Sequence, residues 1–162
     1  MIIGIDPGKI TTFAFISNNK NNISWKQSEI GTNKFIEIIK DIKRQSAYSE
    51  GGEIFIEYVH SMPTDSRKGA FLFGYSVGSL HSALRMEGLN YNLVLPQVWR
   101  KYTNTHSKED SINYIKNILP DISLLPTERS KKDNHNIADA LCIALYGYNL
   151  VFERGLKNDK KE

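Results

Sequence analysis

The sequence predicts an α/β domain with a mixed five-stranded sheet and helices on both faces. Short apolar or alternating runs, which are typical of strands, are interspersed with longer segments whose apolar residues recur at helical spacing. Three predicted strands come first, and a helix then precedes each of the last two. Strands joined by tight turns pair antiparallel, whereas strands joined through a helix pair in parallel, so this order indicates a mixed sheet.

The predicted strands are bounded by turn residues. Pro7-Gly8 stops the first strand, because Pro has no N–H to continue a ladder and Gly permits a tight turn. Pro96 ends the last strand in the same way. Because only a short polar turn connects the second and third strands, we expect the first three to form an antiparallel meander. The five predicted strands are residues 2–6, 11–17, 23–29, 53–57 and 91–95.

Four segments have the spacing of amphipathic helices. Thr32 is the expected N-cap of the first, and Ser107 with Asp110 in the first turn is typical of the start of the third. The second carries Gly74 and Gly78 on one side, which permits close approach of another helix. The four predicted helices are residues 32–46, 68–86, 107–119 and 134–150.

The chain has 162 residues, 40% hydrophobic and 24% charged, which suits one domain with a substantial core. We expect this domain to span residues 1–152 and residues 153–162 to form a charged flexible tail. No stretch approaches the ~20 apolar residues of a membrane span, and the N-terminus lacks the basic lead of a signal peptide. These features predict a cytoplasmic protein with no membrane partner. The single cysteine, Cys142, is predicted to pack in the core.

The net charge of +3 and the pI near 8.9 are a weak indication of a polyanionic partner. Basic residues cluster near position 100, in the segment 129–132 and in the tail. Such a cluster by itself is typical of a solvated face. If the partner is a nucleic acid, these side chains are candidates for contacts to backbone phosphates, which give affinity with little sequence choice. The candidates are Arg100, Lys101, Arg129, Lys131 and Lys132.

Three carboxylates occupy unusual positions. Asp6 and Glu57 end apolar strands, and Asp139 lies inside an apolar helix. Each alone has an ordinary explanation: a turn before Pro7, a strand end in solvent, or an ion pair with a lysine. A carboxylate buried without a partner is costly, so three such placements favour a shared purpose. The first and fourth strands can be neighbours, and the last helix can cross their ends, which would bring the three acids together.

Converging carboxylates need positive charge between them. A hard divalent cation such as Mg²⁺ meets that need, because it prefers oxygen ligands and keeps waters that a substrate phosphate can replace. Two such ions about 4 Å apart can activate a water and stabilise the leaving oxygen of a phosphodiester. The three acids together therefore predict a Mg²⁺-dependent site for phosphodiester cleavage.

The acids lie within motifs whose order is informative. The motifs are IIGIDPGKITTFAFI, IFIEYVH, VLPQVWRKY, HSKEDS and NIADALCIALYG. Over residues 1–149 this ordered set resembles the RuvC-like Holliday junction resolvases of the RNase H-like nuclease superfamily, and its shortness and divergence are most like the phage branch. The first two motifs resemble the acidic strands of that family, the next two its segment carrying a basic residue towards the junction, and the last its catalytic helix.

The resemblance implies an RNase H-like fold over residues 1–152 and an endodeoxyribonuclease of the crossover junction type. Such enzymes are homodimers that bind four-way and other branched DNA and nick two strands symmetrically, with Mg²⁺ or Mn²⁺ and without a nucleotide cofactor. A phage-encoded member would act in the host cell cytoplasm. Position by position, Asp6, Glu57 and Asp139 match three of the family's four metal-binding acids.

The fourth acid of the family corresponds to Asn136, one helical turn before Asp139. An Asn can offer its carbonyl oxygen to a metal ion but brings no charge, which predicts weaker binding of at least one ion. Because Asp→Asn is the nearly isosteric change that silences such a site, Asn136 is either a natural residue or an inactivating replacement. His135 lies on nearly the same helix face, and Asp133 either joins the site or caps the helix.

Further positions acquire roles through the resemblance. Lys108 resembles a family lysine near the scissile phosphate, where it would neutralise developing charge; it is equally well explained as a surface lysine of a first helical turn. Tyr58 and His60 follow the second acid, where the family places an aromatic side chain that wedges between DNA bases.

The predicted helix 68–86 corresponds to the family's dimer helix. Phe71, Phe73, Tyr75 and the two glycines of this helix are candidates for a two-fold contact. An aromatic stripe is more often core than interface, so the dimer depends mainly on the resemblance. Symmetric cleavage of a four-way junction agrees with it, since it needs two active sites related by a two-fold axis.

Three alternatives stay open at this stage. GIDPGKITT also resembles the phosphate loop of actin-like ATPases, although these need a second domain and a second loop, for which the chain has no room. An RNA-processing nuclease related to RuvC would share the fold and the acids. A junction-binding protein inactivated at Asn136 would share the DNA contacts without the chemistry.

Overall fold

The computed structural model describes residues 1–48, 52–60, 64 and 66–153. Its elements follow the predicted order, with one helix that the sequence did not indicate. They are β1 (Ile2–Asp6), β2 (Ile10–Ile16), β3 (Ile23–Glu29), α1 (Asn33–Tyr48), β4 (Glu53–Glu57), α2 (Arg67–Met86), β5 (Asn92–Val94), α3 (Pro96–Thr103), α4 (Lys108–Ile118), α5 (His135–Tyr148) and a π-helical turn (Asn149–Glu153). Residues 61–63 and 65 of the loop before α2, Pro63 among them, and the tail beyond residue 153 lie outside the described residues.

The strands form one mixed sheet in the order β3-β2-β1-β4-β5. The first three strands pair antiparallel as the predicted meander, and β4 then pairs with β1 in parallel. β5 adds to β4, again in parallel. Helix α1, which connects β3 to β4, therefore makes the crossover that a parallel pair requires. The expected adjacency of the first and fourth strands is confirmed.

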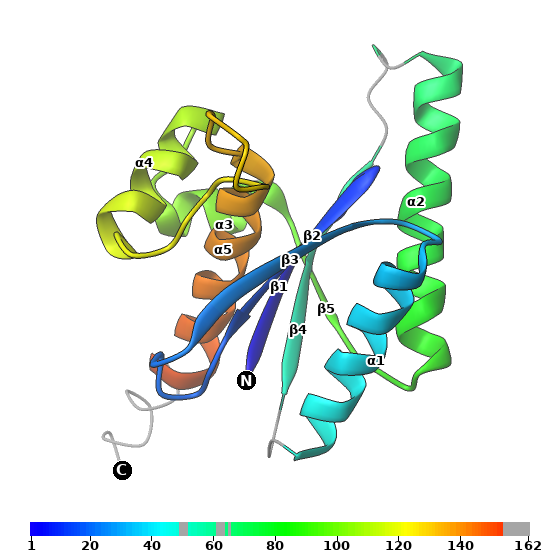
Figure 1. Cartoon of the computed structure of the whole chain (residues 1–162), viewed down its shortest axis with the longest axis horizontal. Helices are drawn as coiled ribbons and strands as arrows, with labels where there is room; N and C mark the ends of the chain where they lie inside the picture. The colour runs from blue at the N-terminus through cyan, green and yellow to red at the C-terminus, as the bar shows by residue number, and fades with distance from the viewer. Residues whose placement is uncertain (49–51, 61–63, 65, 154–162) are drawn as a thin grey trace.

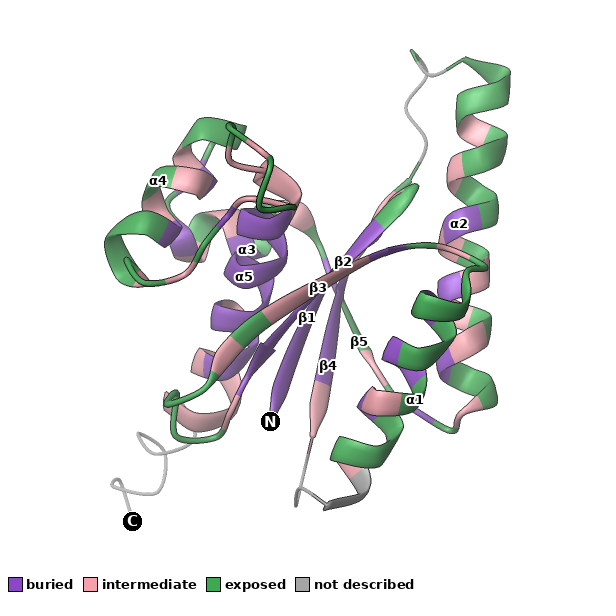
Figure 2. Ribbon diagram, in the orientation of Figure 1, coloured by how far each residue is buried: buried purple, intermediate pink, exposed green. Residues whose placement is uncertain are grey.

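Alternation of side chains along the strands divides the core in two. Ile3 and Ile5 of β1 face α1 and α2, whereas Ile2, Gly4 and Asp6 face α5. Figure 1 shows the resulting layers, with α1 and α2 on one face of the sheet and α3, α4 and α5 on the other. β1, β2, β4 and α5 are the most deeply buried elements, while α1, α2 and α4 present exposed outer sides (Figure 2).

Helix α5 lies unusually close to β1, and Gly4 makes this approach possible. A Cβ atom at Gly4 would stand 2.4 Å from both the carbonyl oxygen of Ala140 and the backbone nitrogen of Ala144. These are backbone atoms of a buried helix and have no room to move. The contact fixes the position of α5 along β1, and with it the position of Asp139, the residue before Ala140.

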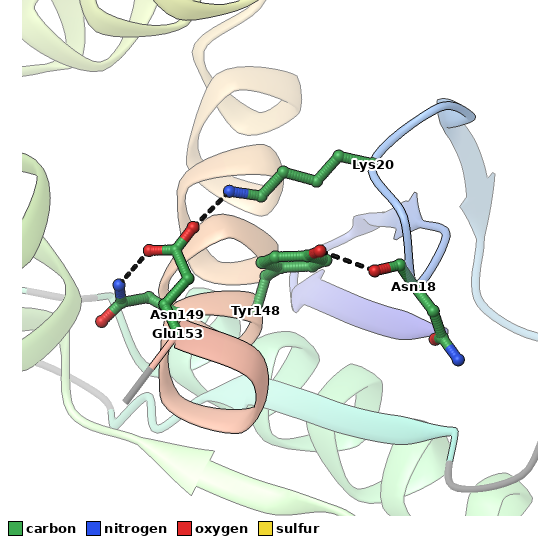
Figure 3. Close-up of polar contacts among 5 residues, drawn as sticks. All are labelled: Asn18, Lys20, Tyr148, Asn149 and Glu153. Carbon is green, nitrogen blue, oxygen red and sulfur yellow. Dashed lines mark hydrogen bonds and ion pairs between the residues drawn. The ribbon is translucent and has the colours of Figure 1, made fainter. Parts of the chain in front are cut away.

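The other end of α5 is tied to the β2–β3 turn (Figure 3). The Tyr148 hydroxyl donates a hydrogen bond to the carbonyl oxygen of Asn18 at 2.6 Å. Lys20, in the left-handed conformation with φ of 58°, lies 4.3 Å over the Tyr148 ring and pairs with Glu153 at 2.5 Å. Glu153, the first residue of the predicted tail, thus belongs to the packed domain, and α5 is anchored at both ends.

Several helix starts agree with the sequence and two details differ. Thr32 caps α1, accepting a hydrogen bond from the Phe35 backbone, and Ser107 with Asp110 forms the predicted capping box of α4. Pro96 does end β5, but it also begins α3 as its first helical residue, a position that suits Pro because no N–H is needed there. The N-cap of α5 is Asn134, so the interpretation of Asp133 as the cap is wrong.

Within the described ranges, none of the helices combines the length and the apolar character that crossing a bilayer requires.

Gly4→Ala should lower the free energy of unfolding by about 3 kcal/mol or more, because the added methyl group overpacks the contact between β1 and α5. Urea denaturation followed by circular dichroism measures the change. Gly8→Ala is the matched control, since a Cβ atom there meets its nearest neighbour at an ordinary 3.6 Å. Equal stability of the two variants would contradict the close approach described here.

Candidate active site

Two of the three unusual carboxylates end the neighbouring strands β1 and β4, and the third lies on α5, which packs against β1. Asp6 and Glu57 end neighbouring parallel strands, and each directly follows a residue of the pair Ile5–Ile56. Both occupy strand positions that face α5. The contact of Gly4 with Ala140 places Asp139 over the same end of β1. These backbone positions are compatible with the predicted convergence of the three side chains.

Electrostatic coupling among the acids agrees with this placement. Burial raises the pKa of Asp6 well above its usual value, and the charges of Glu57 and Asp139 raise it further. Burial also raises the pKa of Glu57 and of Asp139, and the Asp139 charge adds to the rise at Glu57. Each acid therefore costs energy to ionise in this place, chiefly because it is buried.

Two neutral side chains hold the carboxylates in place. The indole Nε1 of Trp99 donates a hydrogen bond to Oε1 of Glu57 at 3.1 Å. Burial raises the pKa of Asp139, and a hydrogen bond from Ser111 of α4 opposes that rise. Sequence reasoning missed both partners, because a buried Trp or Ser acquires this role only when another element is folded against it.

The donor set suits a divalent cation, although the carboxylates do not form a closed cage. Within the described part of the chain, no group of three or more His, Cys, Asp or Glu side chains is arranged to hold a metal ion. Oδ1 of Asp139 is buried and has no hydrogen-bond partner among the described residues, which is a costly state for a carboxylate oxygen. Three carboxylates with one such oxygen fit a hard cation that would draw them together.

Of the neighbours predicted to assist the acids, Asp133 pairs with another residue, whereas His135 and Lys108 interact with the acids electrostatically. The pKa of His135 is lowered by burial and by the Lys108 charge, and the Asp139 charge opposes this. His135 and Lys108 therefore lie at the site. Asn136 is half-buried in the first turn of α5. Asp133 instead forms an ion pair with Lys116 of α4.

Most of the predicted DNA contacts are exposed to solvent. Lys101, Arg129 and Lys131 are exposed, as are Tyr58 and His60, whose rings lie 6.4 Å apart just beyond β4. The exposed Lys132 is close enough to His135 for its charge to lower the pKa of that side chain, after burial and Lys108.

Arg100 differs from the other basic candidates. It is half-buried, it lies beside the carboxylates, and its guanidinium stacks on Trp99 at 5.0 Å. Arg100 opposes the burial-driven rise in pKa at Asp6, Glu57 and Asp139 alike. Its place is therefore in the acidic centre, and the sequence interpretation as a surface phosphate contact did not anticipate this.

Comparison with known proteins identifies the fold. No protein-family model matches the chain, and no curated protein sequence matches it. T. thermophilus RuvC in complex with a Holliday junction substrate aligns with a TM-score of 0.61 and 16% identity, over 92% of this chain and 93% of that chain. Another structure of Thermus thermophilus RuvC aligns with a TM-score of 0.56 and 16% identity, over 92% and 94%. This protein thus has the RNase H-like fold of RuvC, as its sequence predicted.

The raised pKa of Asp6 predicts a pH-dependent effect of Asp6→Asn on the metal-free protein. Burial, Glu57 and Asp139 raise this pKa in the folded state, so folding retains a proton that the unfolded chain has lost. The resulting loss of folding stability is absent below the pKa of Asp6 in the unfolded chain, about 3.9. It grows as the pH rises from there towards the pKa of Asp6 in the folded protein. Asp6→Asn should therefore raise the Tm relative to wild type at pH 7 and change it little below pH 4.

Calorimetry in EDTA measures these Tm values. The exposed Asp121 offers a matched control, Asp121→Asn. A Tm difference between wild type and Asp6→Asn that stays constant from pH 4 to pH 7 would show that the pKa of Asp6 is not raised in the folded protein.

Proposed function

We propose that this protein is a divalent-metal-dependent endodeoxyribonuclease that binds and resolves four-way and other branched DNA. The observation that carries the proposal is the convergence of Asp6, Glu57 and Asp139 at the end of β1 and β4, on a RuvC fold. Three coupled carboxylates at a partly open edge are costly to a protein that has no cation to bind.

Mg²⁺ is the proposed cofactor, with Mn²⁺ as an alternative. Asp6, Glu57 and Asp139 would supply carboxylate oxygens, and Asn136 a carbonyl oxygen. When bound, such ions lower the pKa of a water and stabilise charge on the phosphodiester oxygens. Lys108, whose charge reaches Asp6 and Asp139, is placed to neutralise charge on the phosphate itself.

Branched DNA is the proposed substrate. One structural neighbour, T. thermophilus RuvC, was solved with a Holliday junction. Exposed cations and the exposed rings of Tyr58 and His60 offer phosphate contacts and stacking surfaces of the kind that nucleic acids use. The cations in question are Lys101, Arg129, Lys131 and Lys132. RNA as the substrate remains the second possibility within this fold, and the phage branch remains a prediction.

A homodimer through α2 is the proposed active form. Only Ser76, Leu80 and Leu84 of this helix are buried, so it packs on the domain through a narrow stripe. On the opposite side Phe71 is 74% exposed and Tyr75 60% exposed. Figure 2 shows this exposed side along the length of α2.

The exposed side of α2 also has room for a second helix. A Cβ atom at Gly74 or Gly78 would meet nothing within 4 Å, so a partner helix can come close to the backbone there. Phe73 differs from the sequence interpretation: helical periodicity puts it on the side of Leu80, and it is only half-exposed. The proposed contact therefore consists of Phe71, Tyr75 and the two glycines.

Cleavage of a synthetic four-way junction tests the proposed activity. With Mg²⁺ or Mn²⁺, Asp6→Asn and Glu57→Gln should each slow nicking at least about 100-fold while junction binding persists, because each removes a direct metal ligand. Gel electrophoresis of labelled junctions follows both nicking and binding. Nicking at the wild-type rate in either variant would disprove the assigned site.

Asn136→Asp should nick faster and bind metal more tightly, because it adds a negative charge beside the cation. Activity that appears only in this variant would identify the chain as a junction-binding protein inactivated at position 136. A matched single-stranded RNA substrate separates the RNA-processing alternative.

The dimer is tested by sedimentation velocity. Phe71→Glu combined with Tyr75→Glu should convert a dimer into a monomer, because two charges per subunit would have to be buried in the contact. Ile118→Glu, at an exposed apolar position on α4, is the control and should leave the dimer intact. A wild-type monomer at concentrations that support junction binding would contradict the proposed contact.

A further inference from the structure

Helix α3 brings two adjacent residues to the acidic centre. Trp99 is fully buried and donates to Glu57 through Nε1 at 3.1 Å. Arg100 follows it and stacks on its ring at 5.0 Å. The proposed chemistry assigns no role to this pair, although it contacts the centre more directly than any of the exposed cations.

The backbone at Arg100 is held firmly. Its carbonyl oxygen accepts hydrogen bonds from the backbone nitrogen of Thr105 at 3.0 Å and from the Thr103 hydroxyl at 3.3 Å. Asn104, in the left-handed conformation with φ of 53°, turns the chain sharply after α3. Both threonines are buried. The guanidinium therefore projects from a rigid base, and the stack on Trp99 limits its remaining freedom.

The guanidinium of Arg100 interacts with the carboxylates through its charge but forms no direct ion pair with them. Among the described residues Arg100 forms no ion pair within 4.0 Å, and its Nε is buried without a hydrogen-bond partner. The Asp139 Oδ1 is also buried without a partner. A donor and an acceptor thus stand unpaired in one centre. Burying both costs energy that a direct pair would recover, so the separation leaves the carboxylate oxygens accessible to another cation.

We propose that Arg100 is the built-in counter-ion of the acidic centre: a positioning residue that offsets the repulsion among Asp6, Glu57 and Asp139 in the metal-free protein while leaving their oxygens open to a divalent cation. The cation is that of the proposed function, and to this extent the inference depends on it. A fixed positive charge near the site stabilises the metal-free fold. The same charge repels an incoming cation, so it weakens metal binding.

These opposite effects make the role measurable without DNA or catalysis. Arg100→Gln removes the charge and should lower the Tm of the metal-free protein while it tightens Mn²⁺ binding about fivefold or more, as expected for one charge several ångströms from a divalent ion. Arg100→Lys retains a charge and should restore both properties towards wild type. Lys40→Gln removes an exposed charge from α1, on the other face of the sheet, and should change neither. Calorimetry in EDTA gives the Tm, and isothermal titration with MnCl₂ alone gives the affinity.

The outcomes separate this inference from the proposed function. If the wild-type protein binds no Mn²⁺, the proposed metal site is disproved. The Tm values of the metal-free variants would still test the role of Arg100 as a counter-ion. Wild-type binding with equal or weaker binding by Arg100→Gln would overturn the counter-ion role, as would an unchanged metal-free Tm.

A purely structural role for Arg100 predicts a different pattern, in which Arg100→Lys destabilises the protein as much as Arg100→Gln. If Arg100→Gln fails to fold, it is combined with Asp139→Asn, which removes one negative charge. Recovery of the fold in the double variant supports the counter-ion. Failure to recover it overturns the role.

Discussion

The position of α5 against β1 is the constraint from which the centre follows. Gly4 leaves no space for a side chain, so the helix backbone rests directly on the strand at Ala140 and Ala144. Close-packed backbone cannot slide without creating voids or clashes. This contact and the attachment of Tyr148 to the β2–β3 turn hold a buried carboxylate on α5 over the end of a strand that carries another.

Charge is the second determinant, and it works against the fold. Three acids at one edge are each harder to ionise than in water, chiefly because of burial. Neighbouring side chains offset part of this cost. Trp99 and Ser111 provide hydrogen bonds, Arg100 provides a fixed charge, and Lys108 provides a more exposed one.

The two faces of the sheet serve different ends. The face covered by α3, α4 and α5 carries every group that bears on the acidic centre (Figure 1). The opposite face is covered by α1 and by a helix, α2, that buries only a narrow stripe and leaves aromatic side chains in solvent. A surface of that kind is suited to association, as the proposed homodimer requires.

The sequence alone was sufficient for the strands and for most helices, and it singled out the three acids. The periods of 2 and 3.6 residues are local properties, and Asp6, Glu57 and Asp139 stand out because a carboxylate interrupts an apolar pattern. The resemblance to RuvC also rested on local motifs and their order, and the fold agrees with it.

Only the tertiary structure decided what each of these residues faces. Helix α3 was missed because its eight residues are fewer than the stretch over which helical spacing is recognised, and the contact of its buried Trp99 with Glu57 exists only in the folded chain. Arg100 looked like a surface cation, and Phe73 like a member of the exposed face, until neighbouring elements set their surroundings. The physical reason is that burial, charge coupling and hydrogen-bond partners arise between segments distant in the chain, and no local pattern encodes which segments meet.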